Sequence, residues 1–157
     1  MPLAASSYYT YRTPHGPLTI QVTGGRVSVV TLRRITLIGE MKPCELSNVC
    51  ANQLLEYFAG KRTAFDIPML LSGTPFQKDV WQAIEKIPYG QTRTYEEIAT
   101  AAGRPESFRM VGAAVKKNPL AILVPAHRVV NASGKVPGTD RSAQLRAAMI
   151  ELERRHA

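Results

Sequence analysis

The chain of 157 residues is long enough for one domain, or for a small domain with a compact appendage, and can bury a core. Hydrophobic residues make up 45% and charged residues 20%, which are ordinary values for a globular protein. No apolar run is long enough to cross a membrane, and the first residues lack the charged-then-apolar pattern of a secretory signal. We therefore expect a cytoplasmic protein, or a nuclear one if the source has a nucleus.

The charge of the chain is strongly positive and unevenly distributed. The net charge is +8 and the isoelectric point is about 9.8. From residue 104 onward there are ten Lys and Arg residues against four Asp and Glu, a balance of +6. This distribution favours a polyanionic partner, with nucleic acid ahead of a membrane surface, because no basic amphipathic stripe stands out. A solvated basic surface without a partner remains an alternative explanation.

The first part of the chain has the pattern of a small mixed unit. Residues 17–23 (PLTIQVT) and 26–32 (RVSVVTL) alternate apolar and polar side chains on either side of Gly24-Gly25, which predicts a β-hairpin. Ser47 is a candidate cap for a helix through residues 52–58 (NQLLEYF) that stops at Gly60. Residues 61–73 form an irregular connector. We place the leading domain at residues 1–72 and the second domain at residues 73–157.

The second part is mostly helical. Apolar residues at helical spacing predict a helix that Pro88-Tyr89-Gly90 ends, namely Phe76, Val80, Ile84 and Ile87. A capping box of Thr94 and Glu97 begins a second helix, and Gly103 ends it. Residues 107–118 (SFRMVGAAVKKN) form a third helix. Its expected inward residues are Phe108, Val111 and Val115, and its expected outward residues are Arg109, Lys116 and Lys117.

Two short helices joined by a tight turn are typical of a helix-turn-helix motif. Many helical domains contain such a pair without touching DNA, but the basic charge favours DNA binding here. Gly112 and Ala113 give the second helix a surface without long side chains. Such a surface allows either close approach to a groove wall of DNA or close packing against another helix, and the sequence leaves both open.

The two cysteines do not predict a disulfide framework or a metal site. No histidine or further cysteine lies near Cys44 and Cys50 in the sequence. Cys50 is spaced with Leu54 and Tyr57 along one face of the expected helix, which favours a buried and inert thiol. Neither cysteine has the setting of a nucleophile, and we expect no metal and no organic cofactor.

Five motifs after residue 72 carry a resemblance to a known family. They are GTPFQKDVW, IPYGQTRTYEEIA, FRMVGAAVKKNP, PAHRVV and SGKVPG. Together they resemble the O6-alkylguanine-DNA alkyltransferases, which move an alkyl group from guanine onto their own cysteine. The likeness runs from about Gly73 to Glu153, and LLEYFAGKRTAFDIP is similar to the end of that family's leading domain. The resemblance implies an α+β protein, in which a small leading β-hairpin/helix domain packs on a mainly helical domain with the helix-turn-helix.

The resemblance also identifies the position where the reactive atom should be. The family's motif reads Pro-Cys-His-Arg, and this chain has Pro125-Ala126-His127-Arg128. A thiolate is a good nucleophile and a stable alkyl acceptor, whereas the methyl side chain of Ala126 is neither. The family pattern implies that His127 is the base that acts through a water, that Glu153 orients it, and that Asn118 braces the turn before this segment. From the residues alone, these three side chains could equally be structural.

The remaining expected site residues would bind the DNA or the lesion. By resemblance, Arg109 enters the base stack and Tyr95 crowds the phosphate behind the extruded nucleotide. We expect the rest of the surface to come from Gly112, Ala113, Ala126, Arg128, Val129, Thr139 and Asp140. Where the family usually has Gly-Tyr and small residues over the pocket, this chain has Gly138-Thr139-Asp140-Arg141-Ser142, so this lid has lost its aromatic ring.

These two departures favour a non-enzymatic alkyltransferase-like protein. Such a protein would be a monomer that flips O6-alkylguanine out of duplex DNA, holds it in a pocket without cysteine, and marks it for nucleotide excision repair proteins. It would act in the cytoplasm on the nucleoid. The alternative is an alkyltransferase whose acceptor cysteine has been replaced by Ala126. A helix-turn-helix regulator ranks last, because the expected recognition helix is poor in Asn and Gln for reading base edges.

Overall fold

The computed structural model describes residues 5–157 and has the predicted mixed α+β class. The chain forms two compact units. The first comprises the chain up to Ser72 together with Pro119–Leu123, and the second comprises Gly73–Asn118 and Val124–Ala157. Each unit has its own elements and is described by itself.

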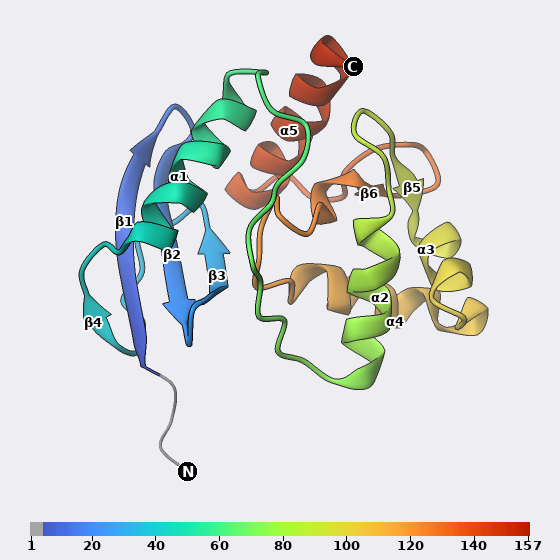
Figure 1. Cartoon of the computed structure of the whole chain (residues 1–157). Coiled ribbons are helices and arrows are strands. Elements are labelled where there is room, and N and C mark those ends of the chain that lie inside the picture. The colour runs from blue at the N-terminus through green and yellow to red at the C-terminus, as the bar shows by residue number, and fades with distance from the viewer. Residues whose placement is uncertain (1–4) are drawn as a thin grey trace. The chain divides into compact units, whose positions relative to one another are not determined.

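Within the described residues, the first unit contains a four-stranded sheet in the order β3-β2-β1-β4 (Figure 1). The strands are β1 (Ser6–Thr13), β2 (Gly16–Thr23), β3 (Arg26–Thr31) and β4 (Glu40–Met41). Strands β1, β2 and β3 pair antiparallel in succession, and β4 runs parallel to β1. The predicted hairpin is therefore confirmed as β2–β3. Its turn requires glycine because the φ angles of Gly24 and Gly25 are 57° and 79°.

Two irregular segments cover the free edge of β3. The Val27 amide donates to the Pro68 carbonyl at 2.8 Å, and the Leu70 amide donates back to the Val27 carbonyl at 2.8 Å. Residues 119–121 pair with Val30 in the same way, through two further backbone hydrogen bonds of 2.8 and 3.0 Å. The edge of this sheet is thus hydrogen-bonded along much of its length, which leaves few groups for pairing with another chain.

Helix α1 (Glu45–Phe58) packs on one face of this sheet (Figure 1). Its N-cap is Cys44, so the prediction that Ser47 caps it is wrong. Ser47 lies three residues further on, where its Oγ accepts from the Cys44 amide at 2.9 Å while Cys44 Sγ accepts from the Ser47 amide at 3.4 Å. The helix ends before Gly60, as predicted, because Gly60 has a φ of 74°.

The prediction of an inert Cys50 is confirmed. Its side chain has no exposed surface and lies on the buried side of α1 with Leu54 and Tyr57. Burial raises the pKa of the Cys50 thiol to about 12, so this thiol stays protonated near neutral pH.

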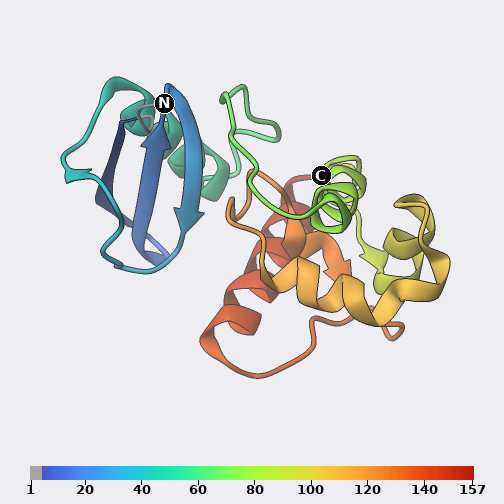
Figure 2. The ribbon, with the colours of Figure 1, turned by 90° about the horizontal axis from the view of Figure 1, so that it is seen from below.

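The second unit contains the remaining helices and two very short strands (Figure 2). The elements are α2 (Pro75–Glu85), β5 (Arg93–Thr94), α3 (Tyr95–Ala101), η1 (Pro105–Ser107), α4 (Phe108–Lys116), η2 (Ala126–Arg128), β6 (Val129–Val130) and α5 (Arg141–His156). Strands β5 and β6 pair in parallel, which joins the start of α3 to the segment after η2. Helices α3 and α4, with the turn between them, form the predicted helix-turn-helix pair.

Trp81 on α2 anchors the second helix of that pair. Its side chain is 1% exposed, and its indole Nε1 donates to the Ala114 carbonyl of α4 at 2.9 Å. Val80 and Ile84 are buried beside it on the same helix, as predicted. Phe76 lies at the start of α2 and is half-buried, with the Arg104 guanidinium 5.2 Å from its ring centroid.

Helix α4 differs from the prediction at its first residue. Val111 and Val115 face the interior as expected, together with Ala114. Phe108 is 39% exposed, so the prediction that it faces inward is wrong. Its spacing places Phe108 on the same side of the helix as Val111 and Val115, but it is the first residue of α4 and lies at the end of that buried side.

Helix α5 was not predicted as an element. Asp140 caps it, with its carboxylate accepting from the Ala143 amide at 2.9 Å.

Within residues 5–157, no helix combines the length and the apolar character that a membrane span requires.

Replacing Trp81 with Phe tests its anchoring role. The variant loses the hydrogen bond to Ala114 and part of the buried volume, so we expect the free energy of unfolding to fall by about 1–3 kcal/mol. Urea denaturation followed by circular dichroism measures this loss. Tryptophan fluorescence is unsuitable, because the chain has a single tryptophan and the variant has none. The exposed control Val49→Ala should shift the free energy by no more than about 0.5 kcal/mol. Equal stabilities of the two variants would contradict the assignment.

Candidate functional site

A groove of about 540 Å³ lies over the helix-turn-helix pair. It gathers four of the residues that the sequence nominated for DNA binding, namely Tyr95, Arg109, Gly112 and Ala113. The other lining residues are Thr94, Glu96, Phe108, Lys116, Asn131, Ala132 and Pro137. The groove is therefore built from α3, from one side of α4, and from the loop that follows β6.

The position of Tyr95 in this groove follows from the capping box before it. The Glu97 amide donates to Thr94 Oγ1 at 3.1 Å, and the Thr94 amide donates to Glu97 Oε1 at 3.0 Å. The backbone hydrogen bond from Thr94 lowers the pKa of Glu97, with help from the Thr94 side chain. This box fixes the first turn of α3 and makes Tyr95 its first residue.

Helical spacing explains which residues of α4 reach the groove. Arg109, Gly112, Ala113 and Lys116 are three or four residues apart and so share one side of the helix. A Cβ added at Gly112 would lie 4.0 Å from Tyr95 Cε1, in contact with the ring. Glycine at this position therefore keeps the space between α4 and Tyr95 open. The same spacing from Arg109 could have added Lys116 to the residues nominated from the sequence.

The segment around residue 126 lies in the interior of the second unit. Ala126 is 8% exposed, and its amide donates to the Val124 carbonyl at 2.7 Å. Asn118 Nδ2 donates to the same carbonyl at 2.9 Å. The Asn118 side chain thus spans the loop from the end of α4 to the residues just before Ala126, which is the geometry expected of a brace.

The Glu153 carboxylate is the centre of a buried ionic network. It is 1% exposed, and its Oε2 lies 2.5 Å from His127 Nε2. The Arg128 guanidinium binds both oxygens, with Nε donating to Oε1 at 2.8 Å and Nη2 donating to Oε2 at 3.1 Å. The Gly90 amide also donates to Oε1 at 3.0 Å. The network joins the turn after α2, the segment at η2, and α5.

Burial lowers the pKa of His127 below its ordinary value, and the nearby positive Arg128 acts in the same direction. The hydrogen bond to Glu153 and its negative charge oppose this shift without overcoming it. His127 is therefore a neutral imidazole near pH 7. Because Glu153 is a carboxylate acceptor, we assign the proton of the ring to Nε2, which leaves Nδ1 as the acceptor nitrogen.

Three residues nominated for contact with the DNA or the lesion are buried, namely Ala126, Arg128 and Val129. Arg128 is 7% exposed, and its Nη1 donates to the Ile87 carbonyl at 2.7 Å in addition to its bonds with Glu153. Val129 has no exposed surface. In this conformation neither side chain can touch a nucleic acid directly. A buried guanidinium is destabilising unless it is paired, and Glu153 supplies the pairing carboxylate, so the Arg128 side chain is part of the network.

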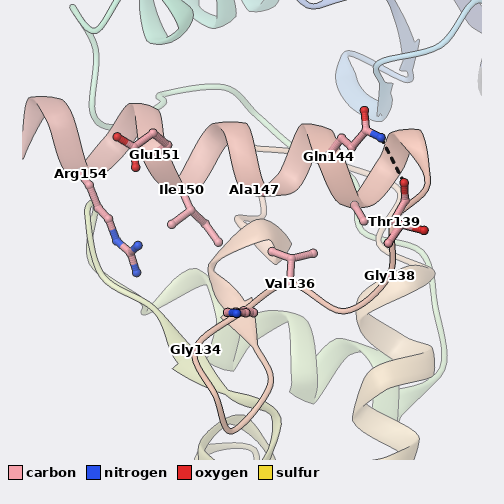
Figure 3. A pocket seen from close by; sticks show the side chains of 11 residues that line it. Gly134, Val136, Gly138, Thr139, Gln144, Ala147, Ile150, Glu151 and Arg154 are labelled. Atoms are coloured by element: carbon pink, nitrogen blue, oxygen red, sulfur yellow. Dashed lines mark hydrogen bonds between the residues drawn. The ribbon is translucent and has the colours of Figure 1, made fainter.

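The lid residues Thr139 and Asp140 are exposed but are held by α5. Gln144 Nε2 donates to the Thr139 carbonyl at 3.1 Å, as Figure 3 shows, and Asp140 is occupied as the cap of the helix. Between this loop and α5 lies a second hollow of about 490 Å³. Val136 and Ile150 face into it from opposite sides, with Arg154 at one end (Figure 3).

No group of three or more His, Cys, Asp or Glu residues within residues 5–157 is placed to hold a metal ion. Cys44 is engaged in the first turn of α1. The structure thus offers two features for chemistry in the second unit, the groove over α3 and α4 and the network around Glu153.

The chain belongs to the 6-O-methylguanine DNA methyltransferase family, whose DNA-binding-domain model matches residues 75–155. A methylated-DNA–protein-cysteine methyltransferase of Mycobacterium tuberculosis is 43% identical, over 96% of this chain and 93% of that protein. The constitutive enzyme of that name from Bacillus subtilis is 38% identical over 94% of both.

Solved structures agree with these relatives. The crystal structure of M. tuberculosis O6-methylguanine methyltransferase has a TM-score of 0.89 and 39% identity, over 97% of this chain and 94% of that one. The structure of the M. tuberculosis protein in complex with DNA has a TM-score of 0.87 and 41% identity, over 96% of this chain and 94% of that one.

These relatives overturn the preferred functional expectation from the sequence. A non-enzymatic protein that marks lesions for excision repair was favoured because of Ala126 and the altered lid. These relatives are named as methyltransferases, and the chain matches them over nearly their whole length, so that expectation is wrong. They support the alternative, an alkyltransferase in which Ala126 occupies the acceptor position.

The neutral state of His127 predicts a pH dependence of stability. Its pKa is lower in the folded chain than in the unfolded chain, where it is about 6.5. Below that pH the unfolded state binds more protons than the folded state, so stability falls as the pH is lowered. The slope from one group is at most about 1.4 kcal/mol per pH unit.

Urea denaturation between pH 7 and pH 5 measures this slope. We expect His127→Gln to have a shallower slope than the unchanged chain. Burial also lowers the pKa of His15, so this residue contributes to the slope as well. The variant His15→Gln measures that contribution and serves as the control. An identical slope in the unchanged chain and in His127→Gln would contradict the neutral assignment.

Proposed function

We propose that the groove over α3 and α4 binds duplex DNA containing O6-alkylguanine, and that the chain is an alkyltransferase with alanine at the acceptor position. The observation that carries the proposal is the gathering of Tyr95, Arg109, Gly112 and Ala113 along one groove. The names of the relatives and the structure of one of them with DNA support it.

The side chains of the groove fit the task of extruding a nucleotide. Arg109 is exposed on α4 and would enter the base stack, while Tyr95 on the facing helix would crowd the phosphate of the nucleotide that leaves. Gly112 and Ala113 let the helix backbone approach the DNA closely, and Lys116 adds a positive charge for a phosphate. Extrusion costs a few kcal/mol and less for a damaged base that pairs badly, which favours the lesion.

The transfer itself needs a thiol at residue 126. A thiolate attacks the alkyl carbon, a sulfur–carbon bond forms, the bond from that carbon to guanine O6 breaks, and the guanine that leaves takes up a proton. Ala126 has neither a lone pair nor an acidic hydrogen, so the chain with alanine cannot take this step. In a chain with cysteine there, neutral His127, oriented by Glu153, would draw the thiol proton through a water.

Replacing Ala126 with Cys is the test. We expect Ala126→Cys, incubated with a duplex containing O6-methylguanine, to gain the mass of one CH₂ group at residue 126, while the duplex regains guanine. Intact-protein and peptide mass spectrometry measure the transfer. The unchanged chain controls for Cys44 and Cys50, and Ala126→Ser controls for the added polar atom, because a hydroxyl is a far weaker nucleophile than a thiolate.

An Ala126→Cys variant that folds, binds the lesion duplex and gains no mass would overturn the assignment of residue 126. Failure of the unchanged chain to bind the lesion duplex would overturn the assignment of the groove. The binding titration should be repeated at increasing salt, because contacts with phosphates make the affinity fall steeply as salt rises.

A further inference from the structure

Phe108 is an exposed aromatic residue in the proposed DNA groove. It is the first residue of α4, it is 39% exposed, and it lines the groove together with Arg109. Moving a phenylalanine side chain out of water is favourable. A large apolar side chain exposed in a groove is therefore a candidate contact for a partner.

The ring lies beside the arginine that the proposed function places in the base stack. The Arg109 guanidinium carbon is 5.9 Å from the Phe108 ring centroid, within the range of a cation–π contact. The two side chains are neighbours in the sequence and line the same groove. The contact keeps the guanidinium next to the aromatic ring.

We propose that Phe108 stacks on a base of the duplex next to the site of extrusion, so that Phe108 and Arg109 enter the DNA together as one wedge. The inference rests on the proposed function, because it requires that this groove binds DNA. Apolar side chains inserted at a base step partly unstack it and bend the duplex. An aromatic ring compensates for the lost base–base stacking, while the guanidinium supplies charge and hydrogen bonds.

The surroundings of the ring favour a base over an apolar protein surface. Lys116 and Arg109 outnumber Glu96 among the charged residues that line the groove, and the side of α4 between the two cations carries only Gly112 and Ala113. An apolar partner would leave both cations unpaired as they lose water, whereas DNA supplies phosphates next to its bases. Met110 is also exposed, at 59%, but does not line the groove.

The location of Met110 provides a matched control. It follows Arg109 on the same helix and lies two residues from Phe108, which places it roughly 200° around the helix axis. Replacing either residue with Leu keeps an apolar, helix-forming side chain. Phe108→Leu removes the ring from the groove, and Met110→Leu changes an apolar side chain outside it. A third variant, Phe108→Trp, keeps an aromatic face.

The experiment measures the affinities of the unchanged chain and the three variants for a duplex with O6-methylguanine and for the same modified strand alone. We expect Phe108→Leu to weaken duplex binding by about tenfold, a loss typical of removing one stacking contact. Binding of the single strand should change less, because a single strand has no paired base step for the wedge to open. Phe108→Trp and Met110→Leu should retain the duplex affinity.

A fluorescent base reports the contact itself. With 2-aminopurine beside the lesion, we expect the inserted wedge to unstack this base from its neighbour and brighten its emission in the complex, and Phe108→Leu to leave the emission more quenched. Equal duplex affinities and equal emission for Phe108→Leu and the unchanged chain would overturn the wedge while leaving the proposed function intact. An equal loss for duplex and single strand would also overturn it. If the unchanged chain binds no lesion duplex, the proposed function fails and the inference fails with it.

Discussion

The second unit depends on one buried negative charge, the carboxylate of Glu153. A carboxylate with 1% exposure is destabilising unless its oxygens are fully hydrogen-bonded and its charge is compensated. Glu153 receives the Gly90 amide, two guanidinium nitrogens of Arg128 and the imidazole of His127. These groups come from separate parts of the chain. The charge therefore holds the turn after α2, the η2 segment and α5 in one arrangement, because moving any of them removes a hydrogen bond or a counter-charge from a buried ion.

This arrangement places residue 126 in a constrained setting. Ala126 directly precedes the two residues that bind Glu153, and its own amide is bound to the Val124 carbonyl. Asn118 holds the same carbonyl from the end of α4. A side chain at position 126 is thus connected through two short hydrogen bonds to the end of the helix that lines the proposed DNA groove. In the proposed alkyltransferase, a cysteine at this position would have a neutral histidine next to it without further rearrangement.

The sequence was informative for several features whose cause is local, although it placed the cap of α1 three residues too late. The turn at Gly24-Gly25, the capping box of Thr94 and Glu97, and the helix stop at Gly60 depend on a few neighbouring residues, and all were predicted. Features that depend on distant partners were not. The exposure of Phe108 depends on which residues fill the core beside α4, and the burial of Arg128 depends on a carboxylate 25 residues away. The alanine at position 126 wrongly suggested a non-enzymatic protein. Similarity over nearly the whole chain says more about ancestry than one altered side chain.

The free energy of unfolding of Glu153→Gln tests the central role of the carboxylate most directly. Glutamine keeps the shape of the side chain but removes its charge, so the buried Arg128 guanidinium loses its counter-ion. The loss predicted is about 3–5 kcal/mol relative to the unchanged chain. Glu151→Gln, an exposed change on the same helix, should stay within about 0.5 kcal/mol. A Glu153→Gln variant as stable as Glu151→Gln would contradict this role of the buried charge.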